Sequence, residues 1–322
     1  ERGQGCGLAV APPMGLKNVL FFGSDEFSIK SFNAFINRLT KTDVNVDLCA
    51  KPCTKFYKTF HGGYNTLEIT GKLRELQIEK QYEFALISSF GLFIPKKFLE
   101  LFKYRLNVHP SLLPKYRGPS PIQTTIMNRD KWSGVSIIDV HPTVIDAGDI
   151  YLQQKVAVLD KATYHDLCDR LADLGGNMLA EVVSDIEKYE KNRVPQSPNP
   201  TLTKKLSKED GRLDFDRMTN LHIESLFRAI SHQIPITMHK DKLSIVFRDL
   251  KDCGDKVPWA LNDTHPPGTV YLDKMTKSLC IKCKHGWISC DSFNMNLSPC
   301  RYDGPMVMSA LQAKNFSRLF SK

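Results

Sequence analysis

The 322-residue sequence contains no run of about 20 apolar residues, so we expect no segment to cross a membrane as a helix. It lacks a secretory signal, and its nine cysteines are an odd number spread along the whole chain. Such cysteine usage is typical of free thiols in a reducing compartment. Cys280 and Cys283 have the spacing of zinc ligands, but the residues around them alternate like a strand, which would put the two thiols on opposite faces. We therefore expect strand packing here and no metal site.

The first residue is not Met, so we expect a fragment or a processed form, although Met14 could also be an internal start. Residues 1–16 are rich in Gly and Pro and lack apolar periodicity. We expect them to form a disordered tail or the remnant of a targeting segment.

The composition, with 42% hydrophobic and 25% charged residues, is ordinary for a folded globular protein, and the length favours two domains. The formal net charge is +9. From Lys204 onward there are 19 Lys and Arg against 13 Asp and Glu, so the last third carries most of the surplus. This balance favours an anionic partner, while a solvated basic surface is the alternative interpretation.

Apolar runs and helix-length segments alternate through residues 17–191. The run at 17–23 (KNVLFFG) is typical of a buried parallel strand, and the segment after it places Phe32, Phe35, Ile36 and Leu39 on one helical face, with Ser24 or Asp25 as cap. A long helical pattern covers about 164–191. The alternation predicts an α/β fold, a Rossmann-like domain with a mostly parallel sheet. Its further strands are expected at residues 44–50, 84–91, 105–110, 133–141 and 149–158.

Residues 192–212 begin with a stretch that contains three prolines and no apolar face, and we interpret them as a linker. Residues 213–322 hold one expected helix at 221–230, followed by short alternating segments separated by turn residues. This pattern predicts a smaller C-terminal β-barrel (OB-like) or a half-open sheet.

Three groups that can do chemistry are expected at strand ends. Asn107 and His109 are two residues apart, so both side chains leave the strand on one face, and Pro110 keeps the backbone extended. Asp146 lies in an Asp-Ala-Gly turn between two strands. An amide can donate to an oxyanion, an imidazole can donate or move a proton, and a carboxylate can hold that imidazole protonated.

No hydroxyl or thiol stands beside these three groups as an obvious nucleophile. The set therefore favours direct transfer of an acyl-type group to an external amine over a covalent intermediate. A hydrogen-bonded loop without catalysis is the alternative for residues 105–121.

Five motifs occur in order along the chain: "FFGSDEF", "SSFGLFIPKKFLE", "LNVHPSLLPKYRGPSPIQ", "SGVSIIDVHPTVIDAGDI" and "KKLSKEDGRLDF". Together they resemble the methionyl-tRNA formyltransferase family. The Asn-x-His core is typical of folate-dependent formyltransferases in general, including those that act on glycinamide ribonucleotide or nucleotide sugars. The last motif, followed by a basic β-rich region, is similar to the tRNA enzyme in particular. The stretch "CKHGWISCDSF" is similar to the animal mitochondrial form.

The resemblance implies a formyltransferase fold, 10-formyltetrahydrofolate as formyl donor, the initiator methionyl-tRNA as acceptor, no metal, a monomer and a place in the mitochondrial matrix. It assigns catalysis to Asn107, His109 and Asp146. Arg117 and Gly118 are expected to secure the loop rather than touch substrate. The residues that the resemblance assigns to folate are Ser111, Leu112, Leu113, Pro114, Ser88, Ser89, Phe90, Gly91, Leu92 and Ile94.

The chain departs from the bacterial pattern after the second strand, where residues 51–63 replace a Pro- and Arg-rich insertion that meets tRNA in bacterial relatives. Phosphate contacts are expected from Lys51, Lys55 and Lys58, with Phe56 and Tyr57 able to stack on bases. A solvated basic loop is the alternative. In the linker, the expected phosphate contacts are Lys204, Lys205, Lys208 and Arg212.

The sequence also allows two other classes of function. One is a formyltransferase or formyl-folate hydrolase that acts on a small metabolite, which would have no need of the basic C-terminal region. The other is a nucleic-acid-binding protein on an inactive scaffold, against which the complete set of Asn107, His109 and Asp146 argues.

Overall fold

The computed structural model describes residues 17–39, 44–240, 243–254, 264–273, 278–297 and 306–309, so the tail expected at 1–16 lies outside the described residues. The chain divides into two compact units. The first comprises residues 1–117, 134–156 and 168–202, and the second comprises residues 118–133, 157–167 and 203–322. The domain boundaries expected at residues 16, 191 and 212 stay a prediction.

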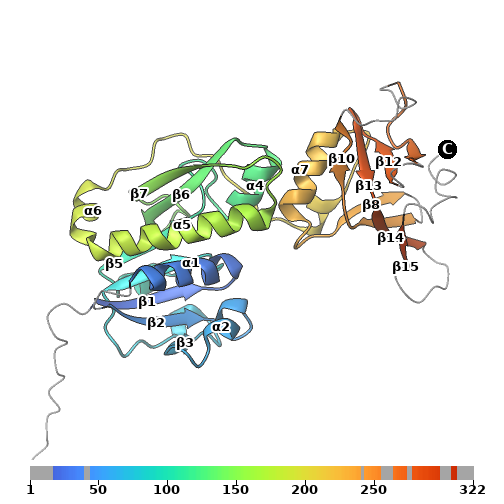
Figure 1. Ribbon diagram of the computed structural model, residues 1–322. Coiled ribbons are helices and arrows are strands. Elements are labelled where there is room, and N and C mark those ends of the chain that lie inside the picture. The colour runs from blue at the N-terminus through green and yellow to red at the C-terminus, as the bar shows by residue number, and fades with distance from the viewer. Residues whose placement is uncertain are drawn as a thin grey trace, which may run out of the picture. The chain divides into compact units, whose positions relative to one another are not determined.

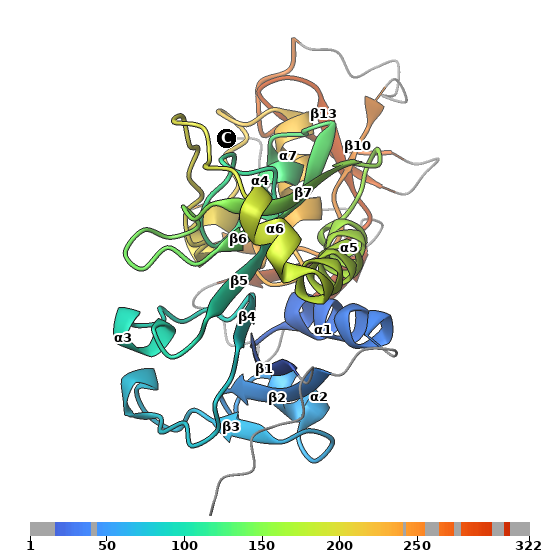
Figure 2. The ribbon, with the colours of Figure 1, turned by 90° about the vertical axis from the view of Figure 1, so that its left-hand side faces the viewer.

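A seven-stranded sheet runs in the order β3-β2-β1-β4-β5-β6-β7, and Figure 2 shows these strands one after another. The pairs from β3 to β5 are parallel, whereas β5 and β6 are antiparallel. The mostly parallel α/β sheet expected from the sequence is therefore confirmed. The strands are β1 (Lys17–Gly23), β2 (Val44–Ala50), β3 (Thr66–Glu68), β4 (Phe84–Ser88), β5 (Tyr104–His109), β6 (Trp132–Asp139) and β7 (Ile150–Ala157).

Helices follow most of these strands (Figure 1). The long helical pattern expected at 164–191 forms two helices, of which the first ends at Ser184 and the second begins at Ile186. Lys17 Nζ donates to the carbonyl oxygens of Val183 and Ser184 at 2.6 and 3.1 Å, which satisfies acceptors at that helix end. The helices are α1 (Glu26–Arg38), α2 (Lys55–Phe60), α3 (Lys96–Leu99), α4 (Pro121–Met127), α5 (Tyr164–Ser184), α6 (Ile186–Asn192) and α7 (Asn220–Ile230), with 3-10 turns η1 (Leu73–Glu75) and η2 (Lys208–Gly211).

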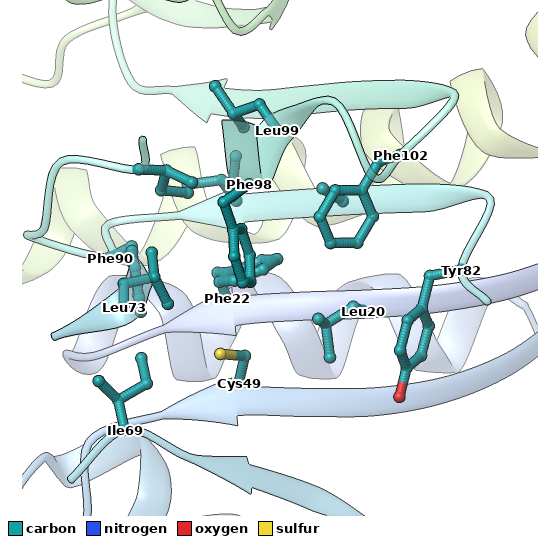
Figure 3. Packing of buried hydrophobic residues seen from close by; sticks show 13 residues of the cluster. Leu20, Phe22, Cys49, Ile69, Leu73, Tyr82, Phe90, Phe98, Leu99 and Phe102 are labelled. Carbon is teal, nitrogen blue, oxygen red and sulfur yellow. The ribbon is translucent and has the colours of Figure 1, made fainter. Parts of the chain in front are cut away.

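The two phenylalanines of β1 point to opposite faces of the sheet, as strand alternation requires. Phe21 meets the rings of Phe32, on α1, and Phe56, on α2, with centroids 4.9 and 5.7 Å away. Phe22 belongs to a cluster on the other face, together with Phe90, Phe98 and Phe102. Figure 3 shows the side chains of this cluster. Both faces of the central strand are thus buried, which explains its continuous apolar run.

Helix α1 begins with the cap expected from the sequence. Asp25 accepts from the backbone N–H of Ser28, and the side chain of Ser28 accepts from the N–H of Asp25, which is a complete capping box. Helix α5 approaches α1 very closely at Gly176, where a Cβ atom would lie 2.2 Å from the carbonyl oxygen of Ser31. Only glycine fits that contact, which fixes how the two helices pack.

The second unit is rich in short antiparallel strands, in agreement with the β-rich C-terminal domain expected. Its strands form two four-stranded sheets, ordered β10-β13-β12-β11 and β15-β14-β9-β8. Cys280 lies in β12 and Cys283 directly follows it, and both thiols are buried. The strands are β8 (Ile236–Lys240), β9 (Leu243–Phe247), β10 (Lys251–Asp252), β11 (Val270–Leu272), β12 (Leu279–Lys282), β13 (Trp287–Cys290), β14 (Ser292–Leu297) and β15 (Met306–Ser309).

Candidate active site

The structure brings together the amide, imidazole and carboxylate expected to form the site. Asn107 and His109 lie at the carboxyl end of β5, where Asn107 is half-buried and His109 is buried. Nδ2 of Asn107 donates to Oδ1 of Asp146 at 3.1 Å, and Nδ1 of His109 lies 3.5 Å from Oδ2 of the same carboxylate. One carboxylate therefore faces both neighbours on β5, one with each oxygen.

The other ring nitrogen of His109 has a backbone partner. Nε2 lies 2.9 Å from the carbonyl oxygen of Tyr116. Because a carbonyl oxygen only accepts, Nε2 must carry a hydrogen, and this fixes the neutral tautomer. Nδ1, on the side of Asp146, is therefore the nitrogen that can exchange a proton with a reacting group.

Asp146 is held in an unusual backbone conformation. Its φ is +53°, in the left-handed region that few side chains other than Asn and Asp adopt readily. Two residues later, a Cβ atom on Gly148 would lie 1.9 Å from the carbonyl oxygen of Asp139, so the turn requires glycine there. Asp139 N–H donates to the carbonyl of Asp149 at 2.9 Å and closes the base of the loop.

Residues 111–114, which the resemblance assigns to folate, form a tightly held loop. Ser136 Oγ donates to the carbonyl of Ser111 at 2.7 Å and accepts from the N–H of Leu113 at 3.2 Å, and Gln153 donates to the carbonyl of Leu113 at 3.0 Å. The side chains of Ser111 and Leu113 are buried, whereas those of Leu112 and Pro114 are half-exposed. A folate on this loop would therefore meet Leu112, Pro114 and backbone groups.

Strand β4 ends at Ser88, three residues before the end expected from the sequence, because Ser89 adopts a φ of +45°. Ser24 Oγ donates to the carbonyl of Ser89 at 2.5 Å, and Ser89 Oγ donates to the carboxylate of Asp25. Burial raises the pKa of Asp25, against the hydrogen bonds from Ser89 and the helix backbone. These contacts fix the segment after β4 at the end of β1, the point in the sheet where strand order reverses and where ligands bind in open α/β folds.

The other residues assigned to folate by the resemblance differ in accessibility. Ser88, Phe90 and Ile94 are buried, and Phe90 and Ile94 belong to the cluster shown in Figure 3. Gly91 is exposed, while Ser89 and Leu92 are half-buried. A pterin at this segment would thus meet Ser89, Gly91 and Leu92.

Part of the expectation for residues 51–63 was wrong. Phe56 is 0% exposed and packs against the rings of Phe21, Phe32 and Phe60, so it cannot stack on a nucleic-acid base. The ring of Tyr57 is half-buried and stacks on His61. The cations expected at phosphates remain accessible: Lys55 and Lys58 are exposed and Lys51 is half-buried.

The four cations of the expected linker are exposed, but two of them face acids. Lys204 pairs with Asp210, and Arg212 lies 3.9 Å from Glu209. Arg212 also lines a hollow of about 640 Å³ together with Glu209, Asp214 and Asp216. The carboxylates of these three residues weaken the electrostatic attraction between Arg212 and a phosphate. Lys205 and Lys208 are the better candidates in this stretch.

Within the ranges that the structure describes, no three His, Cys, Asp or Glu side chains form a group that could hold a metal ion. In the same part of the chain, no helix has both the length and the apolar character needed to cross a membrane.

Several residues that hold the site were not expected from the sequence: Ser136, Gln153, Gln196 and Thr201. Gln196 Nε2 donates to the carbonyls of Asp146 and Gly148, both at 2.8 Å, while its Oε1 accepts from the guanidinium of Arg117 at 2.9 and 2.7 Å. The securing role expected for Arg117 therefore runs through Gln196. Neither Gln196 nor Thr201 belongs to a periodic apolar pattern, so the sequence carries no signal for them.

Comparison with known proteins shows the family to which this chain belongs. The formyl transferase family model matches residues 62–183, and the model of the formyl transferase C-terminal domain matches residues 205–296. The methionyl-tRNA formyltransferase of Bos taurus mitochondria is 30% identical over 303 residues, which cover 89% of this chain and 76% of that protein. The chain belongs to the methionyl-tRNA formyltransferase family.

Other mitochondrial methionyl-tRNA formyltransferases match over shorter stretches. The Rattus norvegicus protein is 32% identical over 213 residues, and the Homo sapiens protein 31% over 223 residues, covering 65% and 68% of this chain. The matches span 55%, 57% and 76% of the rat, human and bovine proteins.

Solved structures share the fold. HypX from Aquifex aeolicus in complex with tetrahydrofolic acid superposes with a TM-score of 0.60 at 13% identity, covering 95% of this chain and 48% of that one. Methionyl-tRNA formyltransferase from Clostridium thermocellum gives a TM-score of 0.52 at 23% identity, covering 73% of this chain and 93% of that one.

Proposed function

We propose that this protein transfers the formyl group of 10-formyltetrahydrofolate to the α-amine of methionyl-tRNA. The observation that carries the proposal is the Asp146 carboxylate, which faces Asn107 with one oxygen and His109 with the other in a member of this family. The family match supports the choice of donor and acceptor.

The reaction needs charge stabilisation at one oxygen. The amine nitrogen attacks the formyl carbon, and the electrons of the C=O bond move onto oxygen. The formyl oxygen then accepts from Asn107 Nδ2 and from Nδ1 of protonated His109. Both groups now face Asp146, and hydrogen bonds of this kind commonly tighten only when substrate binds.

The protons balance within the same set of groups. The attacking amine gains a positive charge and releases a proton, which Asp146 accepts directly or through a water molecule. When the tetrahedral intermediate collapses, the C=O bond re-forms, the bond between the formyl carbon and N10 of the folate breaks, and N10 takes up the proton that Asp146 accepted. An unperturbed α-amino group has a pKa of about 7.7–8.0, so much of the nucleophile is neutral near pH 8 and positioning supplies most of the rate.

The finer assignments rest on the same proposal. The acceptor is the initiator methionyl-tRNA, and the basic residues Lys51, Lys55, Lys58, Lys204, Lys205, Lys208 and Arg212 contact its phosphates. The mitochondrial relatives support a place in the mitochondrial matrix. One chain holds the whole Asn107, His109 and Asp146 set, which supports action as a monomer.

The test incubates the purified protein with 10-formyltetrahydrofolate and methionyl-tRNA, and measures formyl-methionine by mass spectrometry. Initiator and elongator methionyl-tRNA are compared in parallel, with an amino sugar nucleotide and a reaction without acceptor as controls. Formylation of the initiator alone is the expected result. Formylation of the sugar, or release of formate without acceptor, would replace this proposal by the small-metabolite alternative.

A further inference from the structure

Residues 194–202, here called the strap, lie across the candidate site although the sequence predicts a linker. The strap begins beside β7, where Val194 and Ile150 exchange backbone hydrogen bonds of 2.8 and 3.0 Å. It ends beside the loop after β5, where Thr201 N–H donates to the carbonyl of Pro114 at 3.2 Å and its carbonyl accepts from the N–H of Arg117 at 2.9 Å. All of these residues belong to the first unit.

The strap contacts the backbone of Asp146, the residue whose carboxylate faces Asn107 and His109. The side-chain amide of Gln196 gives one hydrogen to each of two carbonyls, those of Asp146 and Gly148, at 2.8 Å. Its oxygen accepts two hydrogen bonds from Arg117. This pattern settles the orientation of the amide, since a flipped group would place its oxygen against two carbonyls and its hydrogens against guanidinium donors.

The strap also contacts the residue on the other side of His109. Thr201 Oγ1 accepts from the N–H of Tyr116 at 2.8 Å, and the carbonyl of Tyr116 faces Nε2 of His109. Tyr116 has a φ of +63° and Asp146 a φ of +53°. Both partners of the imidazole are thus non-glycine residues in the left-handed region, a conformation that persists only where surrounding contacts enforce it.

We propose that the strap positions His109 from both sides, with Gln196 as a positioning residue that directs the Asp146 carboxylate toward Asn107 and His109. The proposal rests on the proposed function, since that function gives the three groups their task. Without the two hydrogen bonds from Gln196, the Asp146 turn loses its link to Arg117 and the carboxylate moves relative to Nδ1 of His109.

Two substitutions separate positioning from simple attachment of the strap. Gln196→Ala removes the hydrogen bonds to the Asp146 and Gly148 carbonyls and also those from Arg117. Gln196→Glu keeps an acceptor for Arg117 but has no hydrogen to donate to the Asp146 and Gly148 carbonyls. We expect kcat of both variants to fall roughly 10- to 100-fold with little change in KM for the formyl donor, since a small misplacement of a reacting group has effects of that size.

The matched control is Gln154→Ala, which removes an exposed glutamine of β7 and should keep wild-type kcat. Recovery of kcat in Gln196→Glu would overturn the proposal, because it would show that attachment to Arg117 is enough.

A second measurement does not depend on turnover. In protein labelled with ¹⁵N-histidine, the ring signals of His109 are assigned by their loss in His109→Gln. Both Gln196 variants should shift the Nδ1 signal, which senses Asp146, while Gln154→Ala leaves it in place. An unchanged Nδ1 signal in both variants would refute the positioning role. If the wild type failed to formylate methionyl-tRNA, the proposed function would fall, and this measurement would still decide whether the strap holds the imidazole.

Discussion

Asn107 and Asp146 are 39 residues apart in the sequence and are joined by a 3.1 Å hydrogen bond from the amide nitrogen to a carboxylate oxygen. The bond has two consequences. First, the amide hydrogens of Asn107 point toward the space that Nδ1 of His109 also faces. Second, the carboxylate of Asp146 holds the amide in that orientation. In the proposed reaction, the formyl oxygen enters this space and replaces the carboxylate as the acceptor.

Asn107→Ala should lower kcat by on the order of 10²- to 10³-fold, because it removes a donor to the developing oxyanion. The effect on KM for methionyl-tRNA should be small, since the hydrogen bond strengthens only in the transition state. Steady-state formylation kinetics with both substrates measure the change, and circular dichroism checks that the variant is folded. Turnover close to wild type in a folded variant would contradict the role given to Asn107.

Lys55→Ala and Lys58→Ala should weaken tRNA binding without changing base preference. Each removes an exposed cation of α2 that, in the proposed function, neutralises a tRNA phosphate. The slope of log K against log salt should fall by about 0.7–0.9 for each phosphate that is no longer neutralised. Filter binding at several salt concentrations gives the slope, and Lys191→Ala, an exposed lysine of α6, is the matched control. A wild-type slope near zero would refute the basic surface altogether.

Phe56→Ala should destabilise the fold by about 3–5 kcal/mol, because it empties a site between Phe21, Phe32 and Phe60. The adjacent Tyr57→Ala removes a half-buried ring and should cost much less. Urea denaturation of both variants gives the free energies of unfolding. Equal losses for the two would mean that Phe56 contributes no more packing than the half-buried Tyr57.

Asp47 should make stability depend on pH in the acid range. It is buried, and although burial acts to raise its pKa, hydrogen bonds from Lys80 (2.8 Å) and Tyr82 (2.6 Å) hold the pKa below the usual 3.8. A carboxyl whose pKa is lower in the folded state stabilises the fold above its unfolded pKa, and that contribution is lost as the pH falls through the folded value.

Asp47→Asn should therefore lower the free energy of unfolding by about 1.5–3 kcal/mol at pH 7, the range for hydrogen bonds to a charged group. The difference from wild type should shrink as the pH falls below about 3.8, where the carboxyl of the unfolded wild type becomes protonated, and should vanish below the lower pKa of the folded state. Denaturation at pH 7, 5 and 3 tests this. A difference that stays constant over the three values would rule out the ionised carboxylate as its source.

Most strands of the first unit were predictable because their signals are local, and so were the positions of Asn107 and His109 at a strand end and of Asp146 in a turn. The three-residue strand β3 (Thr66–Glu68) was not expected. A continuous apolar run, two polar residues at a strand end and an Asp-Ala-Gly turn each lie within about ten residues of sequence. The direction of β6 was not predictable in this way. It runs antiparallel to β5 and pairs Asp139 with Leu106, three residues before His109, so the loop after β6 must fold back to bring Asp146 to the site.

The strap could not be recognised from the sequence, because its contacts are distant along the chain. Gln196 bonds to residues 50 and 79 positions away, and Thr201 to one 85 positions away. Three prolines and the lack of an apolar face are as typical of a linker as of an extended segment held by side-chain hydrogen bonds. Phe56 was misjudged for a related reason. In the six-residue helix KFYKTF, periodicity alone does not tell which aromatic ring faces the core.

The division of the chain into two units has a spectroscopic consequence. All three tryptophans, Trp132, Trp259 and Trp287, fall in the residue ranges of the second unit, whereas the aromatic side chains of the first are phenylalanine, tyrosine and histidine. Emission excited at the red edge of indole absorption therefore originates in the second unit alone, and the buried indole of Trp287 makes it sensitive to unfolding there. Far-ultraviolet circular dichroism, to which α1 and α5 contribute, reports on both units. Two midpoints from one titration would then give the separate stabilities of the two halves without dissecting the protein.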